Sequence, residues 1–136
     1  MKFTKIFSLI TSLFMTACSA RAANPNVDVV SPEEFQIQLT AESNAYLLDV
    51  RKPEEFADGH LAGAHLINWL DTDSFKQEAA HLDKTRTIYV YCRSGRRSSD
   101  AAGYLAEQGY TVVDMAGGFL AWEKDGLPIT KEADGD

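Results

Sequence analysis

Residues 92–98 read Cys92-Arg93-Ser94-Gly95-Arg96-Arg97-Ser98, and this stretch decides the fold. A hydrophobic run, Ile88–Tyr91, leads into it, and a helix-like run that starts at Ser98 leads out of it. The pattern predicts a buried strand, a short loop and then a helix over residues 98–108. Ligands of parallel α/β sheets bind beyond the carboxyl ends of the strands, so Cys92 occupies a position suited to chemistry.

The loop itself favours a nucleophilic cysteine. Its amides and the N-terminus of the following helix both direct partial positive charge at whatever lies there. The same field favours the thiolate, which is the reactive form of cysteine. Three arginines, Arg93, Arg96 and Arg97, add charge that suits a small anionic substrate.

The cysteine count supports a task for Cys92. The chain has only two cysteines, and the other one, Cys18, lies in the N-terminal segment described below. Proteins exported to an oxidising space more often carry paired cysteines, so an unpaired one there indicates a function. A buried core cysteine is the ordinary alternative. The polar segment that follows, residues 93–97, argues against that alternative.

Residues 1–22 have the composition of an export signal peptide. Lys2 and Lys5 form a positive region, and an apolar stretch over residues 6–15 follows. That stretch is shorter than the roughly 20 apolar residues that a membrane-spanning helix needs. We therefore expect an exported, periplasmic protein.

Two processing routes stay open. Small residues around Ala20-Arg21-Ala22 form a cleavage site that would release a soluble protein. Residues 15–18 resemble a bacterial lipobox, in which Cys18 would be lipidated and anchor the domain to a membrane. The sequence gives no indication of the oligomeric state.

The remaining 114 residues suit one compact domain. All 20 acidic residues but only 10 of the 13 basic ones lie in this part, which leaves a net charge of −10. So acidic a domain is a poor candidate for binding nucleic acid or an anionic membrane surface. The arginines of the loop are a local exception to this charge.

Strand-like and helix-like segments alternate along the chain. Strands are expected at residues 27–30, 45–50, 64–69, 88–91 and 110–115. A helix is expected to start at Ser31 and to include Phe35 and Leu39, and further helices are expected at 53–58, 73–82, 98–108 and 119–124. The alternation predicts a single α/β domain whose five-stranded, mainly parallel sheet carries helices on both faces. We expect a linker and first strand over residues 23–30, the domain proper over 31–130 and a loose tail over 131–136.

Three separated motifs make the chain similar to single-domain rhodaneses, a family of sulfurtransferases. Residues 49–64 resemble the N-terminal signature of that family, although Ala62 stands where members often have proline. Residues 92–98 resemble its active-site loop, and residues 117–122 resemble its C-terminal signature. The resemblance covers residues 27–129 and implies a rhodanese-like fold with Cys92 as the catalytic residue.

The resemblance also implies a reaction, that of a thiosulfate sulfurtransferase without a cofactor. Cys92 would take sulfur from thiosulfate or a similar anionic donor as a persulfide and pass it to cyanide or a thiol. The implied substrate-binding residues are those of the loop, namely Arg93, Ser94, Gly95, Arg96, Arg97 and Ser98. His65 and His81 lack the spacing of metal ligands, so we expect no metal site. A persulfide carrier that serves a protein partner remains an alternative.

A cysteine phosphatase of related fold is the other alternative. The length of the loop distinguishes it from a sulfurtransferase. Six residues, 92–97, precede the helix expected from Ser98. The resemblance associates six residues with sulfur transfer and seven with phosphatases and arsenate reductases. The arginine that tyrosine phosphatases carry six positions after the cysteine is replaced here by Ser98.

Several residues near the motifs have structural interpretations. Asp49 and Arg51 end a buried strand, where charges need partners, so an ion pair is favoured over substrate binding. His60 matches a signature histidine of the family that does not take part in the chemistry. Trp69 and Trp122 are expected to pack in the core or at its rim.

Overall fold

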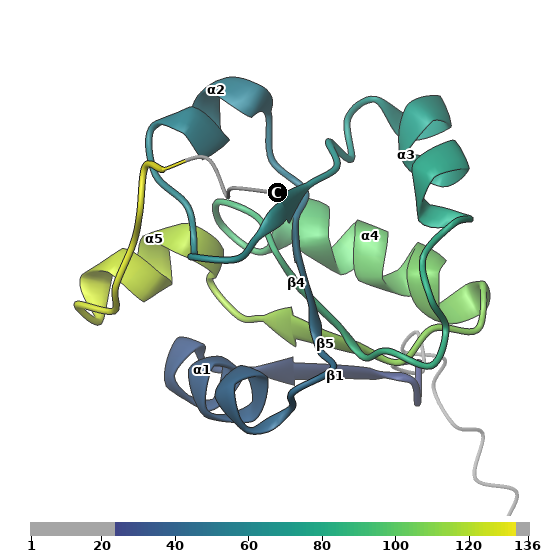
Figure 1. Ribbon diagram of the computed structural model, residues 1–136, viewed down its shortest axis with the longest axis horizontal. Coiled ribbons are helices and arrows are strands. Elements are labelled where there is room, and N and C mark those ends of the chain that lie inside the picture. The colour runs from purple at the N-terminus through teal and green to yellow at the C-terminus, as the bar shows by residue number, and fades with distance from the viewer. Residues whose placement is uncertain (1–23, 133–136) are drawn as a thin grey trace, which may run out of the picture.

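A five-stranded sheet forms the centre of the computed structural model, which describes residues 24–132 (Figure 1). Its strands are β1 (Val27–Val30), β2 (Tyr46–Asp49), β3 (His65–Leu66), β4 (Ile88–Tyr91) and β5 (Val112–Met115). They lie in the order β1-β5-β4-β2-β3, and each pairing between neighbours is parallel. The α/β class and the parallel five-stranded sheet are thus confirmed.

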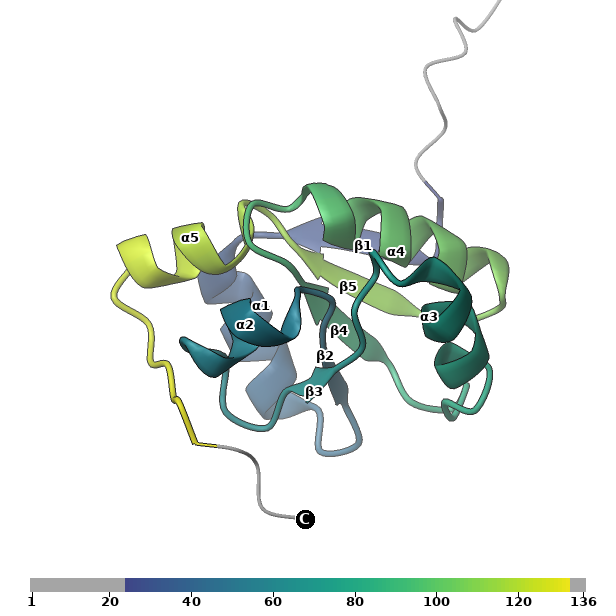
Figure 2. The ribbon, with the colours of Figure 1, turned by 90° about the horizontal axis from the view of Figure 1, so that it is seen from above.

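Helices cover both faces of the sheet (Figures 1 and 2). They are α1 (Pro32–Ala41), α2 (Pro53–Ala57), α3 (Thr72–Ala79), α4 (Arg96–Glu107) and α5 (Gly118–Lys124). The buried side chains of α3 and α4 belong to one apolar cluster, and those of α1 and α5 to another. The sheet therefore separates two cores within one domain.

Strand β4 shows how the sequence builds both cores. All four of its residues are buried, as a central parallel strand requires. Because side chains alternate between faces, Ile88 and Val90 join the cluster under α3 and α4. Tyr89 and Tyr91 join the cluster under α1 and α5.

Two expected boundaries are wrong, namely the start of helix α4 and the extent of strand β3. Helix α4 begins at Arg96 and not at Ser98, because Gly95 adopts a left-handed conformation (φ 99°) and caps the helix. Strand β3 covers two residues and not residues 64–69. Beyond it, the amides of Ile67 and Trp69 still donate to carbonyls of Asp49 and Val50, at 3.0 and 3.1 Å, but without a regular ladder.

The expected export signal, including Cys18, lies outside the described residues, as does most of the expected tail. Within residues 24–132, none of the helices combines the length and the apolar character needed to cross a membrane.

Candidate functional site

Cys92 directly follows β4, at the carboxyl end of the sheet, as expected. Its side chain is fully buried and belongs to the apolar cluster under α3 and α4. Its Sγ nevertheless accepts a hydrogen bond from the Gly95 amide, with N and Sγ 3.1 Å apart. The thiol therefore lies at the base of the loop, although the polar sequence after it predicted a more exposed position.

Gly95 is the residue that shapes the loop. Its positive φ lets the chain turn back so that its amide faces the sulfur, while its carbonyl starts α4 by accepting from the Ser99 amide at 3.1 Å. The same carbonyl lies 3.3 Å from the hydroxyl of Ser98, which is fully buried. The sulfur thus sits at the N-terminus of a 12-residue helix, where helical amides carry partial positive charge.

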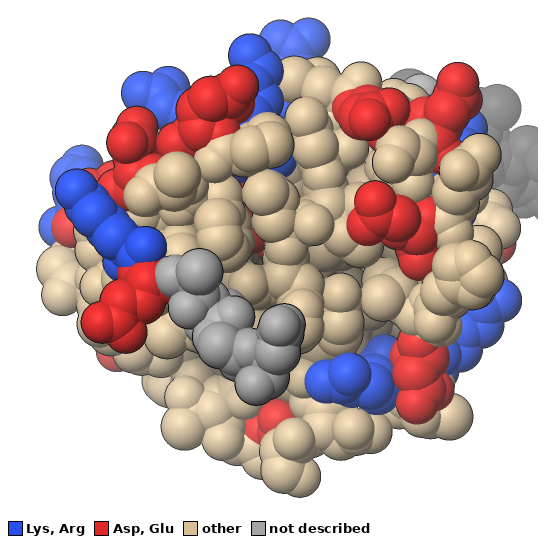
Figure 3. Space-filling model, turned by 45° about the horizontal axis from the view of Figure 1, so that its top comes forward, with Lys and Arg blue, Asp and Glu red and all other residues tan. Residues whose placement is uncertain are grey.

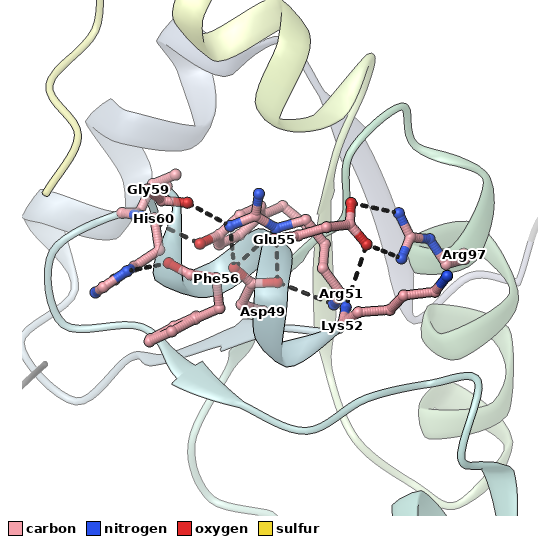
Figure 4. Close-up of polar contacts among 10 residues, drawn as sticks. Asp49, Arg51, Lys52, Glu55, Phe56, Gly59, His60 and Arg97 are labelled. Atoms are coloured by element: carbon pink, nitrogen blue, oxygen red, sulfur yellow. Dashed lines mark hydrogen bonds and ion pairs between the residues drawn. The ribbon is translucent and has the colours of Figure 1, made fainter. Parts of the chain in front are cut away.

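The three loop arginines have different surroundings. Arg93 and Arg96 are exposed, and within residues 24–132 their guanidinium groups make no hydrogen bond or ion pair. Arg97 is partly buried and binds Glu55 of α2 through two hydrogen bonds of 2.7 and 3.0 Å (Figure 4). Two of the three expected substrate-binding arginines are therefore available to an anion, and the third already has a carboxylate partner.

Glu55 was not singled out from the sequence, yet it links α2 to α4. Besides Arg97, it accepts a hydrogen bond from the Lys52 amide at 3.3 Å. The hydrogen bond from Arg97 is the main reason that the pKa of Glu55 is lowered, and it raises the pKa of Arg97 in turn. Both groups therefore stay ionised at neutral pH.

The third motif, residues 117–122, holds the backbone of the loop through hydrogen bonds. The amide of Phe119 donates to the carbonyl of Cys92 at 2.8 Å, and the amide of Leu120 donates to that of Arg93 at 3.0 Å. Gly118 (φ 60°) permits this approach, because a Cβ there would lie 2.5 Å from the Cys92 carbonyl oxygen. The segment that resembles the C-terminal signature thus acts as a backbone support for the loop that follows Cys92.

The expected ion pair between Asp49 and Arg51 is confirmed. The two side chains are buried and their closest atoms are 2.7 Å apart (Figure 4). Arg51 also donates to the carbonyl of Gly59 at 2.7 Å and lies 4.3 Å from the ring centroid of Phe119. This pair joins the first motif to the third.

The structural interpretation of His60 is also supported. Its ring is buried and stacks on Phe56, with the ring centroids 3.6 Å apart, and its Nδ1 lies 2.9 Å from the Phe56 carbonyl. Trp122 is buried and Trp69 packs at the rim of the other cluster, as expected. Within residues 24–132, no group of three or more potential ligands is arranged to hold a metal ion.

Asp114 is a second residue that the sequence reading missed. It is buried in β5, an otherwise apolar strand, and its Oδ1 has no hydrogen-bond partner among the described residues. Burial is the main cause that raises its pKa to about 6. The available signal was an acidic residue inside the apolar run 110–115.

One face of the molecule is mixed in charge. Figure 3 shows acidic and basic side chains interspersed on one face, with uncharged residues between them. That face carries no continuous basic patch.

Comparison with known proteins identifies relatives over nearly the whole described domain. Residues 31–125 match the model of the rhodanese-like domain family. A sulfurtransferase of Allochromatium vinosum is 35% identical over 109 residues, which cover 76% of this chain and 94% of the relative. The thiosulfate sulfurtransferase GlpE of Ectopseudomonas mendocina is 36% identical over 94 residues, covering 68% and 82% of the two chains.

Solved structures of rhodanese-like proteins have a similar fold. A rhodanese-related protein from Thermoplasma volcanium superposes with a TM-score of 0.69 at 25% identity, covering 77% of this chain and 99% of the other. A rhodanese-like domain protein from Staphylococcus aureus gives a TM-score of 0.64 at 29% identity, covering 76% and 98%.

Proposed function

The chain belongs to the rhodanese-like family of sulfurtransferases, and on that basis we propose that it moves a sulfur atom from thiosulfate, or a similar anionic donor, to cyanide or a thiol. The observation that carries this proposal is the hydrogen bond of 3.1 Å between the Gly95 amide and Cys92 Sγ, at the start of α4. A donor at this position stabilises negative charge on sulfur, as both a thiolate and a persulfide require.

The reaction has two steps. The Cys92 thiolate attacks the outer sulfur of thiosulfate, a sulfur–sulfur bond forms, and sulfite leaves with the electron pair of the bond that breaks. Cyanide or a thiolate then attacks the outer sulfur of the Cys92 persulfide and leaves as thiocyanate or a new persulfide, while Cys92 returns to the thiolate. Covalent catalysis thereby divides one difficult transfer into two easier ones.

The roles of the loop residues follow from their surroundings. Arg93 and Arg96 are exposed and would attract the sulfonate oxygens of the donor. The amides of the loop would surround the outer sulfur of the persulfide. Arg97 would hold α2 against the first turn of α4 through Glu55 and contact the donor only if that pair opened.

A phosphatase is less well supported. Arg97 is the arginine nearest to the position that tyrosine phosphatases use, and Glu55 already occupies both ends of its guanidinium group. A persulfide carrier for a protein partner would use the same first step and differ only in the acceptor.

We further propose that the domain acts in the periplasm after export. The composition of residues 1–22 supports this. The mass of the mature protein purified from its membrane and soluble fractions would separate cleavage after Ala22 from lipidation of Cys18.

Intact mass after incubation with thiosulfate tests the main proposal. We expect a gain of one sulfur, roughly 32 Da, that cyanide removes with release of thiocyanate, as covalent sulfur transfer requires. The Cys92→Ser variant should fold normally and gain nothing. Turnover of an aryl phosphate without any gain in mass would favour the phosphatase, and a gain that persists in Cys92→Ser would exclude Cys92 as the nucleophile.

A further inference from the structure

The ion pair between Glu55 and Arg97 lies beside the nucleophile. Arg97 belongs to the first turn of α4, and the N-cap of that helix, Gly95, donates its amide to Cys92 Sγ at 3.1 Å. The charge of Cys92 is also among the causes that raise the pKa of Arg97, in agreement with a guanidinium group within electrostatic range of the sulfur. A change of charge at Arg97 therefore alters the potential at the reacting atom.

Glu55 engages both terminal nitrogens of that guanidinium group. Its Oε1 accepts from Nη1 at 2.7 Å and its Oε2 accepts from Nη2 at 3.0 Å (Figure 4). Oε1 also accepts from the Lys52 amide at 3.3 Å, which fixes the carboxylate to the start of α2. Such a two-point pair has a defined geometry, and it cancels the charge of one of the three loop arginines.

The three arginines thus differ in the charge that they offer to an anion. Arg93 and Arg96 are exposed, and in the described part of the chain their guanidinium groups have no carboxylate partner. Arg97 and Glu55 are only 21% and 22% exposed, so water and salt screen this pair less than they screen a fully exposed one. The partly buried arginine is the one that Glu55 neutralises.

This neutralisation matters more for a donor of higher charge. Thiosulfate carries two negative charges, whereas methanethiosulfonate has a methyl group in place of one charged oxygen and carries one. With either donor the Cys92 thiolate forms a bond to the outer sulfur, the sulfur–sulfur bond of the donor breaks, and sulfite or methanesulfinate leaves with the electron pair. The relative use of the two donors therefore reports the charge at the loop.

We propose that Glu55 is a specificity-determining residue: by holding the guanidinium group of Arg97, it withholds one positive charge from the loop and reduces the preference of Cys92 for doubly charged oxyanion donors over singly charged ones. This inference rests on the proposed role of Cys92 as the nucleophile of sulfur transfer. A loop with three free arginines would favour the doubly charged donor more strongly.

The test is the ratio of kcat/KM for thiosulfate to kcat/KM for methanethiosulfonate. Glu55→Gln removes one negative charge but keeps an oxygen that Arg97 can bind, so the ratio should rise by about threefold to tenfold. Glu54→Gln is the matched control, because Glu54 lies on the same helix and is exposed, and its carboxylate has no ion-pair partner within residues 24–132. An unchanged ratio in Glu55→Gln, or an equal rise in Glu54→Gln, would overturn the proposal.

Two further measurements separate charge from structure. Glu55→Asp keeps the charge, so its ratio should stay within about twofold of the wild type although the shorter side chain weakens the pair. The difference between Glu55→Gln and the wild type should shrink between about 0.05 M and 0.5 M salt, because salt screens charges. If Glu55→Asp behaves like Glu55→Gln, or if the effect is independent of salt, Glu55 acts only by holding α2 in place. Thermal denaturation checks folding, and if Glu55→Gln does not fold, a changed ratio in Glu55→Asp refutes the proposal by itself.

Alkylation of Cys92 separates this inference from the proposed function. Iodoacetate is anionic and iodoacetamide is neutral, and both react with the thiolate with loss of iodide, so a change in the thiolate fraction cancels in the ratio of the two rates. Glu55→Gln should raise that ratio by about threefold at low salt, and Glu54→Gln should not change it.

The outcomes of the two experiments are distinguishable. If neither donor transfers sulfur while the alkylation ratio changes as expected, the proposed reaction is wrong and the role of Glu55 stands. An unchanged alkylation ratio in a protein that does transfer sulfur would refute the role of Glu55 alone. A Cys92 that reacts with none of these reagents would overturn both proposals.

Discussion

The amide of Phe119 donates a hydrogen bond of 2.8 Å to the carbonyl of Cys92. Because Leu120 makes the corresponding bond to Arg93, two consecutive peptide groups of the loop are held by the first turn of α5. Their orientation is thus set by residues more than 20 positions further along the chain. The loop is preorganised before any substrate arrives, which is how a site avoids reorganisation during the reaction.

This support predicts a specific effect of Gly118→Ala. Ala at a left-handed position costs about 1–2 kcal/mol of strain. The new Cβ would also lie 2.5 Å from the Cys92 carbonyl oxygen, so the loop must move. We expect Gly118→Ala to lose sulfur transfer and to lower the free energy of unfolding by about 1–3 kcal/mol beyond the strain.

Gly126→Ala is the matched control for that variant. Gly126 also has a positive φ, 71°, but a Cβ there meets nothing within 4 Å. It should show the strain alone, measured by urea denaturation, and keep full sulfur transfer. Equal activities of the two variants would mean that the contact between Gly118 and the loop is unimportant for catalysis.

The loop arginines are predicted to separate into two functional groups. Arg93→Ala and Arg96→Ala remove exposed charges, so they should raise the KM for thiosulfate while changing stability by less than about 0.5 kcal/mol. Arg97→Ala removes a partly exposed ion pair and should lower stability by about 0.5–1 kcal/mol at neutral pH. Steady-state kinetics and urea denaturation on the same three variants test this.

The difference in stability between the wild type and Arg97→Ala should depend on pH in a defined direction. The pKa of Glu55 is lowered in the folded protein, mainly by the hydrogen bond from Arg97. Its contribution is therefore present above the unfolded pKa of glutamate and is lost as the pH falls through the lowered value. The stability difference between wild type and Arg97→Ala should vanish in strong acid. A raised KM at unchanged stability would instead show that Arg97 leaves Glu55 to bind the donor.

The buried pair of Asp49 and Arg51 predicts a large effect on stability. Arg51→Met leaves a buried carboxylate without its partner, which typically costs about 3–5 kcal/mol. Asp49→Asn combined with Arg51→Met removes both charges and should recover part of that loss. Urea denaturation of the three proteins tests this, and a cost below about 1 kcal/mol for Arg51→Met would contradict the structural role.

The sequence predicted those parts of the fold that local patterns encode. The apolar run before Cys92 predicted strand β4, the loop after it and a following helix, so the position of Cys92 at the end of a strand was predicted too. The glycines after β5 predicted the turn into α5. The start of α4 was misplaced because the loop was taken to extend to Arg97, whereas the left-handed Gly95 caps the helix and Arg96 already belongs to it. Strand β3 was overestimated because an apolar run does not reveal where regular pairing stops.

Contacts distant in sequence could not be predicted in the same way. Glu55 and Arg97 are 42 residues apart, and nothing in either local pattern pairs them. The burial of Cys92 depends on how the loop turns back over the helix end, which is a property of the assembled domain. Asp114 was hidden for a related reason, since the burial of its carboxyl and the lack of a partner for Oδ1 are visible only in the assembled domain.

Asp114 also predicts how stability depends on pH. Its pKa rises from 3.8 to about 6 on folding, chiefly through burial. For an acid whose folded pKa is raised, the stability is fully present below the unfolded pKa and is lost as the pH rises through the folded one. Asp114→Asn cannot ionise, so its stability relative to the wild type should increase between about pH 4 and pH 8, by up to ~3 kcal/mol.

Urea denaturation of both proteins at the two pH values measures that difference, with Asp28→Asn as the exposed control on β1. Parallel pH dependences for wild type and Asp114→Asn would show that the carboxyl is solvated or paired in solution. A loss of wild-type stability as the pH rises through about 6, absent from Asp114→Asn, would instead show that the carboxyl ionises while it is buried. The buried carboxyl would then lower the stability of the fold at neutral pH.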